Sequence, residues 1–151
     1  MRSTNESYSI GGYAAVANDT QRVYLSGSRD DGDDYDSGSG TVADTEFQRD
    51  SWGIGYGFRH GRHRLDSDYR QLDTDNSGTP SLPLDIAFLD TDLWQADYVF
   101  EGDAVRFDVS VFGSQIDHGM DNFTLRTPPD FSSLPLPPFQ GPDRRLVDAD
   151  A

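Results

Sequence analysis

The sequence predicts an all-β chain that folds as an antiparallel meander of about six strands. Apolar side chains recur at every second position in most segments, which is the period of a strand with one apolar face. Short turns alternate with long polar loops along the chain. No segment has the apolar spacing of about 3.6 residues that would indicate a helix longer than a turn or two.

The expected strands form three hairpins, at about 7–30, 46–73 and 89–116. The first hairpin alternates least regularly, whereas the second and third alternate over nearly their whole length. On the second hairpin, Trp52 and Ile54 share a face, and Gly53 and Arg59 take the opposite one. The apolar sets, in chain order, are Tyr8, Ile10, Ala14 and Val16; Val23 and Leu25; Trp52, Ile54, Tyr56 and Phe58; Leu65 and Tyr69; Trp94, Ala96, Tyr98 and Phe100; and Val105, Phe107, Val109 and Val111.

The connections between these strands alternate in length. The short turns are at 18–20, 60–62 and 101–103, and the long polar loops are at about 30–46, 73–90 and 117–148. Short turns at one end and long loops at the other are typical of an outer-membrane β-barrel, whose tilted strands need about ten residues to cross the bilayer. The spacing therefore favours a transmembrane barrel.

A soluble β-sandwich is the alternative, because it also alternates apolar and polar positions. Its apolar face would be a core rich in Leu, Ile and Val, but here that face is rich in Trp, Tyr and Phe near the strand ends, as in the aromatic belts of membrane barrels. Bacterial membrane barrels have at least about eight strands. We therefore expect the chain to be one part of a larger barrel whose remaining strands are absent here.

The composition excludes several classes of function. The chain has 12 Lys+Arg, all of them Arg, against 27 Asp+Glu, so that its net charge of −15 would repel the phosphates of nucleic acid. It has no Cys, which excludes disulfides, zinc-finger spacings and thiolate nucleophiles within this chain. No nucleophile elbow or Ser–His–Asp order is present, and we expect no enzymatic activity. The carboxylates of the acidic loops are oxygen ligands of the kind that calcium prefers. The simpler interpretation is that these loops are solvated and bind no ion.

The stretch "DHGMDNFTLR" at 117–126 carries the candidate metal ligands, His118 and Met120. Residues two apart on an extended chain point the same way, so the imidazole and the thioether could converge on one ion. This pair suits copper, particularly Cu(I), and suits calcium or magnesium poorly. Asp117 is the expected partner that orients the imidazole. The alternative is a strand-end His bonded to a neighbouring Asp, with Met120 packed on Phe123.

The run "DHGMDNFTLRTPPD", together with "DTDNSGTPSLPLDI", "YLSGSRDDGDDYDSGSG" and the spacing of the hairpins, resembles the early barrel strands of TonB-dependent outer-membrane receptors. The resemblance extends from about Ser7 to the end of the chain and is greatest to the copper-receptor branch. The resemblance implies a barrel of about 22 strands with an N-terminal plug domain, and the plug domain is absent from this chain. In the copper branch, a His-x-Met pair on the barrel meets a Cys-x-x-x-Met pair on the plug, and His118 and Met120 match the barrel half.

The resemblance implies an uptake receptor in the outer membrane of a Gram-negative cell, energised by the TonB complex through the plug. Its other partners would be the outer-membrane lipid and a metal ion or metal chelate, with copper as the favoured cargo. Two alternatives remain. One is a TonB-dependent receptor for a ferric siderophore, in which His118 would have no role, and the other is a soluble or secreted all-β binding module.

Overall fold

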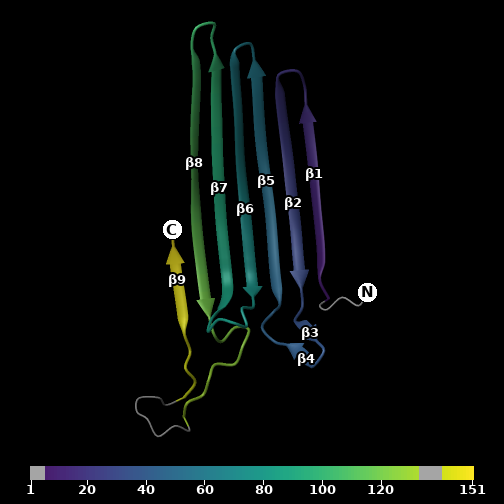
Figure 1. The fold of residues 1–151 in the computed structure, drawn as a ribbon, viewed down its shortest axis with the longest axis vertical. Coiled ribbons are helices and arrows are strands. Elements are labelled where there is room, and N and C mark those ends of the chain that lie inside the picture. Colours follow the sequence, from purple (N-terminus) through teal and green to yellow (C-terminus); the bar gives the residue numbers. More distant parts are fainter. Residues whose placement is uncertain (1–5, 133–140) are drawn as a thin grey trace.

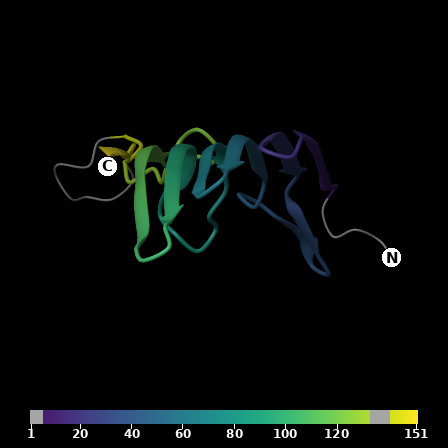
Figure 2. The same cartoon turned by 90° about the horizontal axis from the view of Figure 1, so that it is seen from above.

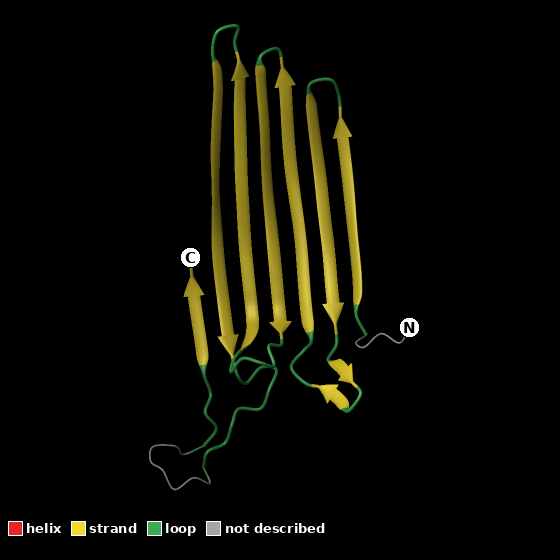
Figure 3. Ribbon diagram, viewed as in Figure 1, coloured by secondary structure: helices red, strands yellow, loops and turns green. Residues whose placement is uncertain are grey.

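The computed structural model describes residues 6–132 and 141–151, and in these ranges the ordered elements are all strands (Figure 3). The all-β antiparallel meander expected from the sequence is confirmed. Seven strands form one sheet in the order β1-β2-β5-β6-β7-β8-β9, and a separate two-stranded sheet pairs β3 with β4 (Figure 1). The strands are β1 Tyr8–Ala17, β2 Gln21–Gly32, β3 Tyr35–Ser37, β4 Gly40–Val42, β5 Phe47–His60, β6 His63–Ser77, β7 Asp85–Glu101, β8 Arg106–Asp121 and β9 Leu146–Asp150.

The structure contains the hairpins β1–β2, β5–β6 and β7–β8, and the second strand of each ends further toward the long loops than residues 30, 73 and 116, where the alternation ended them. The greatest differences are in the third hairpin, where β7 begins at Asp85 and β8 continues to Asp121. Residues 117–121, expected to open a long loop, are strand, and β9 returns along β8 to pair with them. The residues of that loop at 133–140 lie outside the described ranges. Pairing with a further strand explains the difference, because β9 supplies hydrogen-bond partners that local alternation cannot reveal.

The sheet is a single row of strands when it is viewed from above (Figure 2). Among the described residues no hydrophobic side chain is buried, and large ones are open to solvent, such as Val16 at 72% and Phe107 at 60% exposure. Trp52 and Trp94 are also exposed, at 45% and 49%. A sandwich would bury these side chains between two sheets, and the described part of the chain contains no second layer. Within the same residues, no helix is long and apolar enough to cross a membrane.

The strand register sorts the side chains onto two faces. Partners across each strand pair lie on the same face, so the pairs Leu25↔Ile54 and Ile54↔Tyr69 extend one apolar row across three strands. We call this side, which carries the apolar sets of the sequence, the aromatic face. We call the opposite side the arginine face; it carries Gly53, Gly55, Gly57, Arg22, Arg64, Arg70 and Arg106.

The aromatic face changes character toward the long-loop end of the strands. Beyond the row that includes Tyr69 and Trp94, five Asp residues are direct register partners across five neighbouring strands. We call this row the aspartate ladder; its members are Asp50, Asp73, Asp90, Asp117 and Asp150. We call the apolar rows between the aspartate ladder and the short turns the apolar band; on β7, Phe88 lies beyond the ladder.

Candidate metal site

His118 and Met120 lie in β8 on the arginine face, close to the long-loop end. Both side chains are half-buried. Because they are two residues apart in a regular strand, they point to the same side of the sheet. The two residues therefore share one face of the sheet, and their role as metal ligands stays a prediction.

The neighbours of this pair are aliphatic. In the register, His118 lies between Leu89 of β7 and Ala149 of β9. Met120 lies between Ile86 and Val147 on the same two strands. An imidazole and a thioether in an apolar setting, with the carboxylates of the aspartate ladder on the opposite face, are suited to a soft ion and unsuited to calcium or magnesium. The sequence could not identify these neighbours, because β9 was expected to be loop.

Asp117 is not brought to His118. Adjacent residues of a strand point to opposite faces, and Asp117 belongs to the aspartate ladder, paired with Asp90 and Asp150. Its carboxylate accepts a hydrogen bond of 3.2 Å from the Nε2 of Gln115 on the same face. The arrangement in the structure therefore gives no support to Asp117 as the group that orients the imidazole.

His118 and Met120 are two ligands, and a tight copper site needs one or two more. Within residues 6–132 and 141–151, no group of three or more His, Asp, Glu or Cys side chains could hold a metal ion. Both ligands point away from the apolar band, to the side where the arginine face is open to another body.

The arginine face near the short turns holds paired charges. Arg22 of β2 contacts Asp66 of β6 at 2.8 Å, and Arg64 contacts the same carboxylate at 2.6 Å. Arg106 contacts Asp108 at 2.8 Å. All three Arg side chains are more than half exposed, so each pair contributes little stability. The pairs make this face hydrophilic without giving it a large net charge.

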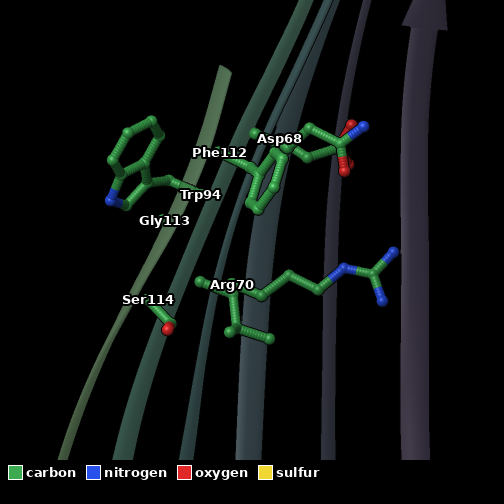
Figure 4. Close-up of a pocket in the computed structure, with 8 residues that line it drawn as sticks. Asp68, Arg70, Trp94, Phe112, Gly113 and Ser114 are labelled. Atoms are coloured by element: carbon green, nitrogen blue, oxygen red, sulfur yellow. The ribbon is translucent and has the colours of Figure 1, made fainter. Parts of the chain in front are cut away.

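Midway along the strands, the arginine face has a hollow that mixes apolar and charged groups. Figure 4 shows Arg70 and Phe112 directed away from the sheet on one side, while the indole of Trp94 points to the other side. Phe112 is 78% exposed, the highest value among the large hydrophobic side chains of the described residues. An aromatic ring this open on a mostly polar face fits contact with another part of a larger protein.

The long-loop end is where buried polar groups gather. The buried polar side chains of the described residues are Ser77, Asp85, Asp121 and Asn122, all located there. Arg126, from the segment after β8, donates to both carboxylate oxygens of Asp85 and lies 3.7 Å from Asp44. These contacts join the start of β7, the connection β4–β5 and the segment after β8. Sequence reasoning missed Arg126, whose one local signal is that it is a lone cation in an acidic loop region.

A second acidic group borders this region at Glu46, just before β5. Burial raises the pKa of Glu46, and the negative charges of Asp34, Asp33, Asp44 and Asp85 raise it further. The main chain of Glu46 accepts a 2.8 Å hydrogen bond from the Gly78 N–H, which ties it to the end of β6. The region is thus held together by hydrogen bonds against the mutual repulsion of its carboxylates.

A one-layer antiparallel sheet with short turns at one end, long loops at the other and two faces of different character defines a barrel-wall type of fold. No protein-family model matches the sequence, and no curated protein matches it. Among solved structures, "Copper transporter OprC" is similar in fold, with a TM-score of 0.76 and 19% sequence identity over 97% of this chain. The match covers 24% of that chain, so the present chain spans about a quarter of its length. At this identity the likeness concerns the fold.

Proposed function

We propose that this chain is a section of the barrel wall of a TonB-dependent outer-membrane receptor, and that the receptor takes up copper. The observation that carries the proposal is the placement of His118 and Met120 side by side on the arginine face near the long-loop end. The aromatic face then contacts lipid with its apolar band, and the arginine face lines the interior. The likeness in fold to a copper transporter supports the same proposal.

In this proposal copper enters from the side of the long loops and binds His118 and Met120 together with ligands from the plug domain. The imidazole and thioether replace water around a soft ion, and the aliphatic neighbours Leu89, Val147 and Ala149 limit access of further water. The TonB complex then acts on the plug, which withdraws its ligands and releases the ion. No covalent bond of a substrate is made or broken.

The test is copper binding by the full-length receptor purified from copper-supplied cells. We expect His118→Ala and Met120→Ala each to lower bound copper at least about tenfold, because even loss of a group that only orients a ligand typically costs about 10–100-fold in metal affinity. The matched control is His60→Ala, because His60 lies at the short-turn end of β5. Equal copper in the receptor and in both ligand variants contradicts the proposal, and uptake of a ferric siderophore unaffected by His118→Ala would support the siderophore alternative.

A further inference from the structure

The end of β8 that carries Met120 is held in place by hydrogen bonds of the two residues that follow Met120, Asp121 and Asn122. Asp121, the residue after Met120, accepts bonds from the N–H of Phe123 at 2.9 Å and of Thr124 at 2.8 Å. Asn122 donates to the carbonyl of Asp143 at 2.7 Å and accepts from the N–H of Arg145 at 2.8 Å. Because no apolar side chain is buried among the described residues, such bonds are what orders this end of the sheet.

Arg126 makes the most extensive of these contacts. Its guanidinium donates to both oxygens of Asp85, to the carbonyl of Leu82 at 2.9 Å and to that of Thr79 at 3.3 Å. Thr79 in turn donates its N–H to Asp85 at 2.7 Å. Asp85 is 1% exposed and the side chain of Arg126 is 17% exposed, so the pair is shielded from solvent. A planar guanidinium that bonds one carboxylate and two carbonyls fixes the orientation of the segment after β8 relative to the start of β7.

The contact bears on Met120 through the start of β7. Asp85 precedes Ile86, and Ile86 is the register partner of Met120. Between Ile86 and Phe88 the register shifts, which marks a bulge at this point of the β7–β8 pair. A bulge interrupts the regular backbone hydrogen bonding of two strands and bends the bulged strand. The regular pairing from Phe88 onward therefore does not hold Ile86 against Met120. His118 pairs with Leu89 on the regular side of the bulge.

We propose that Arg126 is a positioning residue for the copper site, acting on Met120 and leaving His118 in place. By binding Asp85 and the connection before it, Arg126 holds the start of β7 against the end of β8, and this fixes the thioether in the orientation that lets it join the imidazole. The inference rests on the proposed function of His118 and Met120. Arg126 itself does not touch the metal ion.

The experiment is a double-mutant cycle on Cu(I) affinity in the full-length receptor, measured by competition with a chromogenic Cu(I) chelator. We expect Arg126→Ala to weaken Cu(I) binding about tenfold, as loss of a group that orients a ligand does. Adding Met120→Ala to Arg126→Ala is expected to cause little further loss, whereas adding His118→Ala causes its full loss. X-ray absorption of the Arg126→Ala receptor should show weaker Cu–S scattering with the Cu–N scattering retained.

Two further variants separate positioning from general stability. Arg145→Ala removes another Arg of the same segment, whose exposed side chain pairs with Asp143 at 2.6 Å and has no hydrogen bond or ion pair to the described residues of β7, and it should leave affinity unchanged. Arg126→Lys keeps the charge beside Asp85 without the fork, so it should fold as the parent does and bind with intermediate affinity. This second variant keeps the test decisive if Arg126→Ala does not fold.

The outcomes distinguish the two proposals. If His118→Ala and Met120→Ala leave Cu(I) affinity unchanged, the proposed copper site is wrong whatever Arg126 does. If those two variants lose affinity while Arg126→Ala and Arg126→Lys bind as the parent does, the copper site stands and the positioning role is wrong. Full additivity of Arg126→Ala and Met120→Ala also overturns the inference, because it shows that Arg126 does not act through Met120.

Discussion

The aspartate ladder predicts that one neutralising substitution stabilises the protein. Asp90 is the middle member, with Asp73 on β6 and Asp117 on β8 as direct register partners. Asp73 accepts a hydrogen bond from the side-chain amide of Gln71, and Asp117 accepts one from that of Gln115. The side chain of Asp90 has no hydrogen bond or ion pair with the described residues. Like charges in direct cross-strand positions are destabilising. We therefore expect Asp90→Asn to raise the free energy of unfolding.

The magnitude follows from the spacing of cross-strand partners. Two unit charges about 6 Å apart in water repel by about 0.7 kcal/mol, and physiological salt reduces this by about half. With two neighbours, the expected gain from Asp90→Asn is about 0.5–1 kcal/mol. Because the repulsion is screened, the gain should fall by more than half between roughly 0.05 M and 0.5 M salt.

The assay is urea unfolding of the full-length protein refolded in lipid vesicles, followed by Trp fluorescence at low and high salt. The control is Asp97→Asn on the arginine face, where Asp97 accepts hydrogen bonds from Ser110 at 2.5 Å and Gln95 at 2.6 Å, so that no gain is expected. A loss of stability in Asp90→Asn at low salt would refute the reasoning, since it would mean that the carboxylates of the ladder do not repel one another in the folded protein.

Three further predictions concern the loops and turns. Since burial and neighbouring carboxylates raise the folded-state pKa of Glu46, the folded state prefers Glu46 protonated, and wild-type stability falls as pH rises from the unfolded-state pKa through the folded-state pKa. Glu46→Gln should therefore stabilise the receptor at neutral pH and lose its advantage as pH falls below that folded-state pKa, which urea midpoints across a pH series will measure. Asn18→Ala removes an acceptor bonded to the N–H of Thr20 at 2.9 Å and of Gln21 at 2.8 Å, and should cost about 1 kcal/mol in the same unfolding assay; no change would show that the turn does not depend on this side chain. At Gly78 a Cβ would overlap the main chain of Asp44, so Gly78→Ala should cost about 1–3 kcal/mol and expose the long loops to protease, whereas Gly38→Ala, with open space around it, should do neither.

Most strands of the fold can be predicted from the alternation of apolar and polar side chains. This alternation arises because the two faces of each strand meet different environments. The alternating positions of Trp52, Ile54 and Tyr56 predicted a face that the register then confirmed across neighbouring strands. Short connections also occur between the paired strands, at 18–20 as expected, at 61–62 where 60–62 was expected, and at 102–105 where 101–103 was expected. Local sequence suffices where the signal has a period of two residues and lies within one strand.

The long-loop end could not be predicted in the same way. Strand β9 pairs with β8 across a separation of more than twenty residues, and its five residues are too few to show a clear period. The aspartate ladder is likewise invisible in the sequence, because Asp50, Asp73, Asp90, Asp117 and Asp150 become neighbours only through the register of four strand pairs. For the same reason the sequence assigned Asp117 to His118, which is adjacent in the chain and points to the opposite face.

A barrel wall exposes one face of its sheet to lipid, and a nitroxide scan along β8 tests directly which face this is. Val109, Ser110, Val111 and Phe112 would be replaced one at a time by Cys and spin-labelled in the full-length receptor in lipid vesicles, after removal of any Cys outside this Cys-free chain. We predict that oxygen, which concentrates in lipid, reaches the labels at Val109 and Val111 and fails to reach those at Ser110 and Phe112. Equal access of oxygen to all four labels, or access only at Ser110 and Phe112, would contradict the assignment of the aromatic face to lipid.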